Sequence, residues 1–272
     1  MPDIIEKQAR SGPFNLNWLE AGDAPVTLVL LHGIGSNAKS WEAQISVFAP
    51  QYHVIAWNAP GYGLSDALPE NMAATPAAYA NALKALLAHA GQKEFILVGH
   101  SLGGLIAAHF ARLYPAGLQK LILSAPASGY NCQTGESLPD TLQKRLDDIT
   151  LLGPRGLAEN RAAKTLTKAA STSLIARAKD AMASVSIQGY KDAVHLLANG
   201  NLKQDLSALP MPFHVMCGSA DQTTPLTKVE ADTSVPQRLK LTPLDGAAHA
   251  SYLEFPDLFN QTLAVLLGDN AV

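Results

Sequence analysis

The chain has 272 residues, of which 47% are hydrophobic and 16% charged, so it is long and apolar enough to bury a real core, and disorder is excluded as its main state. Its net charge is −3 without a basic tract, which argues against a nucleic-acid-binding protein. No apolar run reaches the roughly 20 residues that span a bilayer, so no membrane segment is expected.

The first ten residues, MPDIIEKQAR, mix charged and apolar side chains and lack the apolar region of a signal peptide. The two cysteines, Cys132 and Cys217, are too few for a disulfide framework or a four-thiolate zinc site. Both fit small buried hydrophobic positions. We therefore expect a cytoplasmic protein.

Short strand-like runs alternate with helical stretches along most of the chain. Ile4–Gln8 and Phe14–Glu20 predict an antiparallel hairpin at a sheet edge. Most of the following runs are nearly continuously apolar, as in strands covered on both faces. These runs are Val26–Leu31, Tyr52–Trp57, Glu94–Val98, Lys120–Ser124, Pro212–Cys217 and Arg238–Leu244. With helical stretches at 38–48, 76–90, 102–114 and 255–267, they predict a mostly parallel sheet with helices on both faces.

The alternation breaks between residues 128 and 206, after the sixth predicted strand. Four helical stretches are predicted there instead, at 138–150, 156–170, 173–185 and 189–198. Open α/β sheets bind ligands at the carboxyl ends of their strands, so we expect this insertion to cover that edge. The predicted organisation is a core domain of residues 1–127 and 207–272 with a helical cap of residues 128–206.

One glycine-flanked serine has the surroundings of a nucleophile. Gly99-His100-Ser101-Leu102-Gly103 fits the pattern G-x-S-x-G, between a strand pattern and a helical pattern. Larger side chains two residues before or after the serine would collide in the strained turn. We therefore predict Ser101 as a nucleophile; a turn with an inert serine is the alternative.

A second glycine turn, His32-Gly33-Ile34-Gly35, follows the strand pattern at 26–31. Acyl transfer creates an oxyanion, which two preorganised backbone N–H groups stabilise. We predict the amides of Ile34 and Leu102 as the oxyanion hole, and we expect His32 to brace the loop. The alternative is an ordinary glycine turn.

A serine nucleophile needs a base and a carboxylate that orients the base. Among eight histidines, His249 lies in the loop between the last predicted strand and the final helix, where catalytic residues of such sheets belong. The others lie in strand or helical patterns or beside the glycine turns, at positions 32, 53, 89, 100, 109, 195 and 214. We predict His249 as the base.

The carboxylate is predicted at Asp221, in the loop that follows the strand pattern at 212–217. The end of the strand pattern at 120–124 is another place for an acid, but the next carboxylate there is Glu136. Asp245 remains the alternative to Asp221.

The chain resembles the α/β-hydrolase family over essentially its whole length. The matching segments are LHGIGS, WNAPGYGLSD, VGHSLGG, GSADQTTP and GAAHASYLEFP. The resemblance implies the α/β-hydrolase fold, a Ser101–His249–Asp221 triad in the family's chain order, an Ile34/Leu102 oxyanion hole and a helical cap. The chain looks most similar to small capped bacterial hydrolases: 3-oxoadipate enol-lactonases, pimeloyl-ester carboxylesterases and meta-cleavage-product hydrolases.

Departures from the family patterns narrow the reaction. Ser101 stands where dehalogenases and epoxide hydrolases carry aspartate, so those activities are disfavoured. Asn58 stands where many relatives carry an aspartate. This difference affects only how the loop around Asn58 is held in place. The resemblance implies a serine hydrolase that cleaves a carboxylic ester or enol-lactone of small to medium size through an acyl-enzyme. A carbon–carbon bond hydrolase with the same triad is the alternative; the S-G-P-G type loop of those enzymes is absent. A further alternative is a non-catalytic binding protein with the same fold.

The expected partner is a small-molecule ester or lactone, with no cofactor, no metal, no nucleic acid and no membrane. Arg145, Arg155 and Arg161 of the predicted cap are candidates to bind a substrate carboxylate through a bidentate pair. Surface solvation explains each of them as well. A homodimer is left open.

Overall fold

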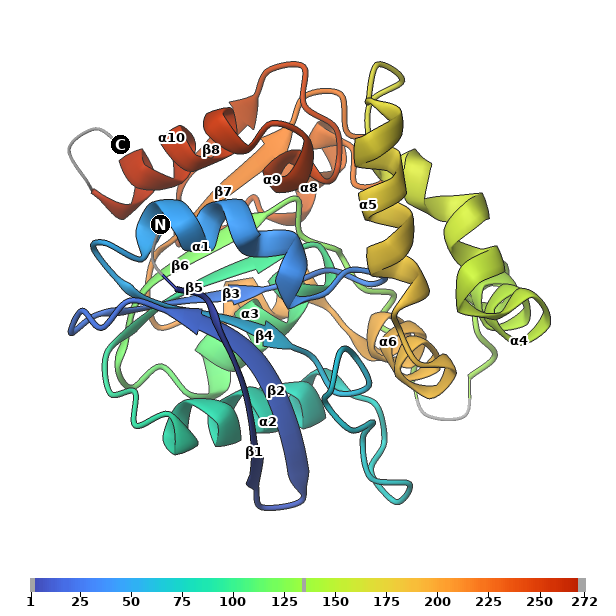
Figure 1. Ribbon diagram of the computed structural model, residues 1–272, viewed down its shortest axis with the longest axis horizontal. Coiled ribbons are helices and arrows are strands. Elements are labelled where there is room, and N and C mark those ends of the chain that lie inside the picture. The colour runs from blue at the N-terminus through green and yellow to red at the C-terminus, as the bar shows by residue number, and fades with distance from the viewer. Residues whose placement is uncertain (1–2, 134–135, 269–272) are drawn as a thin grey trace.

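The computed structural model describes residues 3–133 and 136–268, which form an eight-stranded sheet with helices on both faces (Figure 1). The strand order is β1-β2-β4-β3-β5-β6-β7-β8. β2 pairs antiparallel with both β1 and β4, and all other pairs are parallel. The strands are β1 (Ile5–Ser11), β2 (Phe14–Ala21), β3 (Thr27–Leu31), β4 (His53–Asn58), β5 (Phe95–His100), β6 (Leu118–Ser124), β7 (Phe213–Gly218) and β8 (Arg238–Leu244).

The burial of each strand follows its place in the sheet. Every residue of the central strands β3 and β5 is buried, as their continuous apolar sequences predict. The outer strands are exposed along much of their length: β1 carries Glu6, Lys7 and Arg10, and β8 carries Lys240. The predicted hairpin at the sheet edge is confirmed.

Helices cover both faces of the sheet (Figure 1). Helices α1 and α10 lie on one face, and α2 and α3 lie on the other. The core helices are α1 (Glu42–Phe48), preceded by the 3₁₀ helix η1 (Ala38–Trp41), α2 (Pro76–His89), α3 (Leu102–Leu113), α8 (Leu226–Asp232), α9 (Ser251–Glu254) and α10 (Pro256–Leu267). Within the described residues, no helix combines the length and apolarity that a membrane crossing requires.

A helical insertion separates β6 from β7, as predicted, and its longer helices lie together to the right of the sheet in Figure 1. The first two predicted helices form one kinked helix. Gly153, with φ of 64° and ψ of 178°, breaks the helical conformation directly before Pro154. The elements are α4 (Asp140–Arg161), the 3₁₀ helix η2 (Ala162–Thr165), α5 (Thr172–Ala183), α6 (Ile187–Asn199) and α7 (Leu202–Ser207). The division into a core domain of 1–127 and 207–272 and a cap of 128–206 stays a prediction.

Candidate active site

Ser101 occupies a sharp turn between β5 and α3. Its backbone angles are φ 54° and ψ −115°, which an L-residue adopts only under strain that the surrounding structure maintains. A side chain at Gly99 would overlap the carbonyl oxygen of Gly103, and one at Gly103 would overlap that of Leu31. Both glycines of the motif are therefore required by close backbone approach. The turn sets Ser101 at the N-terminus of α3.

The loop after β3 passes directly beside Ser101. A Cβ atom added to Gly33 would lie 2.9 Å from the Cβ of Ser101 and 3.1 Å from Nδ1 of His100. Ile34 follows in this loop, and Leu102 is the first residue of α3. Among the described residues, the structure gives neither amide N–H a hydrogen-bond acceptor. The two amides predicted as the oxyanion hole are thus near the serine and available.

His249 and Asp221 are joined by a direct hydrogen bond. Nδ1 of His249 lies 2.7 Å from Oδ2 of Asp221, and both side chains are almost fully buried. Oδ1 of Asp221 accepts hydrogen bonds from the backbone N–H groups of residues 223 and 224 at 2.7 and 2.9 Å. Burial alone would raise the pKa of Asp221. The contacts from His249 and these amides outweigh it, so the pKa lies below its ordinary value of 3.8 and the carboxylate is ionised at neutral pH.

The alternative acid, Asp245, is placed differently. It is exposed in the turn after β8, whereas Asp221 is the carboxylate that contacts the imidazole of His249. The loop before His249 is held tightly as well, because a side chain at Gly218 would overlap the carbonyl oxygen of Ala247. The backbone therefore brings the end of β7 and the loop after β8 together, which places Asp221 beside His249.

Two other buried histidines near the site are structural. Nε2 of His100 lies 2.9 Å from the carbonyl oxygen of His249, so His100 donates to the backbone of His249. Burial, together with the neighbouring His249, lowers the pKa of His100 to about 3. His32 accepts at Nε2 from the N–H of Ala59 at 3.1 Å, and burial lowers its pKa to about 4. Both rings are neutral at physiological pH, and His32 braces its loop as expected.

Ser101 and His249 line one cavity between the core and the insertion. Its volume is about 40 Å³, room for only a few water molecules. Ile34 belongs to the core wall, and the insertion contributes small or flexible residues of η2 and α5: Ala162, Thr165, Ala178, Ala181 and Met182. The cavity therefore holds the predicted nucleophile and base against a largely apolar wall.

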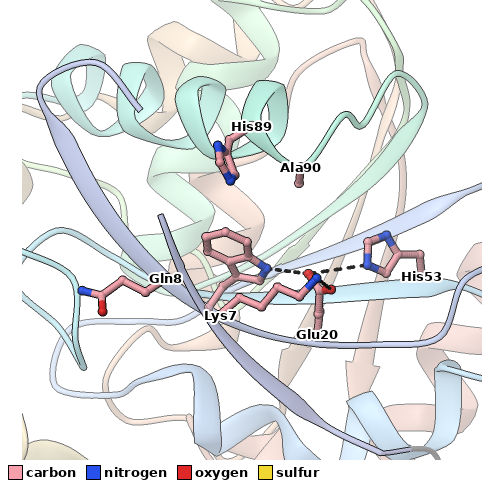
Figure 2. Close-up of a pocket in the computed structure, with 7 residues that line it drawn as sticks. Lys7, Gln8, Glu20, His53, His89 and Ala90 are labelled. Atoms are coloured by element: carbon pink, nitrogen blue, oxygen red, sulfur yellow. Dashed lines mark hydrogen bonds and ion pairs between the residues drawn. The ribbon is translucent and has the colours of Figure 1, made fainter. Parts of the chain in front are cut away.

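A larger groove of about 360 Å³ lies away from this cavity, between the C-terminal end of α2 and strands β1 and β2. Figure 2 shows His89 on the helix above it and Ala90 just after the end of that helix, with Lys7, Glu20 and His53 on the strands below. Glu20 is already paired, with Lys7 Nζ at 2.6 Å and the indole N–H of Trp18 at 2.7 Å. The described residues that line this groove include no serine, and its carboxylate, Glu20, is already paired, so they do not form a hydrolytic site.

The candidate arginines of the insertion do not line the cavity. Arg161 pairs with Asp148 at 2.7 Å, and Arg145 donates to the hydroxyl of Tyr190 at 3.1 Å. Arg155 also lies outside the residues that line it. Arg145 thus joins α4 to α6, whereas Arg161 joins the two parts of the kinked helix α4.

Sequence reasoning missed several residues that hold the site together. Thr224 contacts both Asp221 and His249 through its hydroxyl. Tyr252 stacks on Trp41 with ring centroids 4.2 Å apart, and its hydroxyl lies 2.9 Å from that of Ser36. No local sequence pattern marks these roles, because the contacts of Thr224 with His249, of Tyr252 with Trp41 and of Tyr252 with Ser36 join segments far apart in the chain.

Comparisons with known proteins agree with this geometry. The model of the alpha/beta hydrolase fold matches residues 26–256. A pimeloyl-[acyl-carrier protein] methyl ester esterase of Pectobacterium carotovorum is 30% identical over 253 residues, covering 90% of this chain and 96% of the relative. Among solved structures, an esterase from Exiguobacterium antarcticum superposes with a TM-score of 0.86 at 19% identity, covering 97% of this chain and 100% of that one. The enol-lactonase of Burkholderia xenovorans gives 0.85 at 18% identity, with the same coverage.

The chain belongs to the α/β-hydrolase family. The predicted fold class is confirmed, and so is the predicted enzyme class, an ester hydrolase.

Proposed function

We propose that this enzyme is a serine carboxylesterase that forms an acyl-enzyme on Ser101. The main support is the 2.7 Å hydrogen bond between Asp221 and His249 beside a cavity that His249 shares with Ser101. A strained serine, an imidazole and a buried carboxylate have the roles that nucleophilic catalysis requires.

In the proposed reaction, the ester carbonyl carbon approaches Ser101 from the cavity. His249 accepts the hydroxyl proton at Nε2 as Oγ of Ser101 forms the new carbon–oxygen bond. The N–H groups of Ile34 and Leu102 stabilise the negative charge on the carbonyl oxygen. His249 then returns the proton to the leaving alcohol, and water repeats the sequence to release the acid. Asp221 keeps the proton of the neutral imidazole on Nδ1 and stabilises the imidazolium.

The cavity and the relatives together favour an ester with a small group on one side of the ester bond. The cavity of about 40 Å³ suits a methyl or ethyl group, and the relative from Pectobacterium carotovorum is named for a methyl ester. We propose methyl and ethyl esters of aliphatic acids as the substrate class. Enol-lactones and carbon–carbon bond substrates have no separate support here.

Fluorophosphonate labelling tests the nucleophile. We expect the wild-type enzyme to be labelled at residue 101 in mass spectrometry and the Ser101→Ala variant to be unlabelled and inactive on p-nitrophenyl acetate. Ser36, which also lines the cavity, supplies the matched Ser36→Ala control, which should still be labelled. Labelling of Ser101→Ala would contradict the assignment. A panel of methyl esters, lactones and vinylogous diketones then distinguishes the three reaction types.

A further inference from the structure

We propose that Thr224 is a positioning residue whose hydroxyl holds Asp221 and His249 in their catalytic arrangement. This inference rests on the proposed triad. Thr224 lies in the loop between β7 and α8, three residues after the acid. Its side chain is half-buried and points into the contact between the acid and the base.

The hydroxyl of Thr224 meets three groups at once. Its Oγ1 lies 2.9 Å from Oδ2 of Asp221, 3.2 Å from the carbonyl oxygen of Ala125 and 3.2 Å from Nδ1 of His249. A hydroxyl has one proton to donate and two lone pairs to accept with. It can therefore share its proton between the carboxylate of Asp221 and the carbonyl oxygen of Ala125 while a lone pair faces the N–H of the imidazole. The oxygen therefore bridges Asp221 and His249 at Nδ1 of the imidazole, whereas the proposed proton acceptor is Nε2.

Asp221 depends on neutral donors for its position. In the part of the chain that the structure describes, its one ion-pair partner is His249, and no lysine or arginine pairs with it. Oδ1 is held by two backbone amides, and Oδ2 by His249 and Thr224. Without the Thr224 hydroxyl, Oδ2 would keep only the bond to the base that it is required to orient.

The third contact fixes the hydroxyl itself. Ala125 is fully buried at the end of β6, with a positive φ of 44°. Its N–H donates to the carbonyl oxygen of Met216 on β7 at 2.8 Å, so its own carbonyl is held in place. Thr224 thus connects the ends of β6 and β7 to the loop that carries His249 after β8. The sixth strand, which carries no acid at its end, contributes a backbone acceptor instead.

This bridge has a consequence for the proton transfer. When His249 takes the proton from Ser101, positive charge develops on a ring that is almost fully buried. A fixed hydroxyl dipole stabilises this charge without rearrangement, since its oxygen already faces Nδ1. Removal of the Thr224 hydroxyl should therefore lower kcat, which depends on the stability of the imidazolium formed during the reaction. KM should not change.

Substitution of Thr224 tests the proposal. Thr224→Val replaces the hydroxyl with a methyl group of similar size, and we expect kcat on p-nitrophenyl acetate to fall about 10-fold, the effect of one hydrogen bond to a charged group, with KM unchanged. Thr224→Ser should restore most of the lost kcat. Thr227→Val, an exposed position on α8, is the matched control and should behave as the wild type.

Proton NMR adds a measurement that needs no substrate. The Nδ1 proton of a histidine bound to a carboxylate resonates at low field, and we expect this resonance to move in Thr224→Val and to return in Thr224→Ser. Wild-type kcat in Thr224→Val, or a Thr224→Ser variant as slow as Thr224→Val, would overturn the proposal. Should Thr224→Val fail to fold, Thr224→Ala and Thr224→Ser give the same comparison. Activity in Ser101→Ala would instead refute the proposed function, and the NMR comparison would still decide on Thr224.

Discussion

Glu254 of α9 accepts a hydrogen bond at 2.9 Å from the backbone N–H of Thr167 and a second one from its hydroxyl. Thr167 belongs to the insertion, whereas Glu254 lies five residues after His249. A backbone bond of 2.8 Å from the N–H of Ala250 to the carbonyl oxygen of Thr165 runs beside it. The loop of the base and the helical insertion are therefore fastened to each other next to the cavity.

We expect Glu254→Gln to loosen the insertion without removing any catalytic group. Loss of the carboxylate charge weakens two hydrogen bonds, at a cost of about 1–2 kcal/mol in the free energy of unfolding. KM should rise several-fold while kcat changes little. Hydrogen exchange should become faster in residues 162–185. Glu70→Gln, at an exposed loop position, is the control, and unchanged exchange in Glu254→Gln would contradict the fastening.

Asp221→Asn is expected to lower kcat by about 10⁴-fold, because the amide favours the wrong tautomer of His249. Asp245→Asn should leave kcat close to that of the wild type, since Asp245 is exposed in its turn. Steady-state kinetics with circular dichroism as a folding check compares the two. Near-normal turnover in Asp221→Asn would show that another carboxylate orients His249.

Met182 is expected to limit the size of the substrate. Its Cε lies 2.9 Å from where a Cβ on Gly35 would be, so it closes the cavity over the loop after β3. Met182→Ala should raise the ratio of kcat/KM for p-nitrophenyl hexanoate over acetate by about 10-fold, because pocket discrimination follows the number of methylenes accommodated. Met211→Ala, a partly buried methionine outside the cavity, is the control. An unchanged ratio would show that Met182 does not set the limit.

Asp192 of α6 provides a pH-dependent test of stability. Its Oδ1 accepts from Gln188 at 2.8 Å, and the backbone of Leu68 also contacts this carboxyl group. Burial raises the pKa of Asp192 above its ordinary value of 3.8, so the folded protein binds the proton more readily than the unfolded chain. Stability from this group is complete below that value and is lost as the pH rises through the folded-state pKa.

Asp192→Asn removes the buried charge and should increase the free energy of unfolding by about 1 kcal/mol at pH 7. The gain should disappear well below pH 3.8, where the wild-type carboxyl is neutral in both the folded and the unfolded state. Urea unfolding at the two pH values measures it. Asp180→Asn, exposed on α5, should show no such difference, and a gain that persists at low pH would contradict the explanation.

The sheet could be predicted because its strands are local features. Buried runs such as those of β3 and β5 are apolar at nearly every position, and the predicted boundaries differ by one or two residues. Helices α7, α8 and α9 were not predicted, since segments of six, seven and four residues carry too little periodicity. The helix predicted at 156–170 ends at Arg161 and continues only as the 3₁₀ helix η2.

In the candidate site, too, some residues are marked by local sequence patterns and others are not. Ser101, Asp221 and His249 each stand in a loop that directly follows a strand, so a local pattern marks each of them. The role of Thr224 depends on contacts with residues 99 and 25 positions away, which a single sequence does not encode locally. The role of Arg145 likewise depends on Tyr190 in another helix, and that of Arg161 on Asp148 across the kink of α4.

The exposed outer strands β1 and β8 also affect how copies of the protein meet. An unpaired strand edge invites another chain to extend the sheet, and charged side chains or proline oppose this. β1 presents Glu6, Lys7 and Arg10 on its edge, and β8 presents Lys240 and Pro243. The sheet is therefore protected at both sides against edge-to-edge aggregation, and a dimer of this enzyme would have to form through its helices or loops.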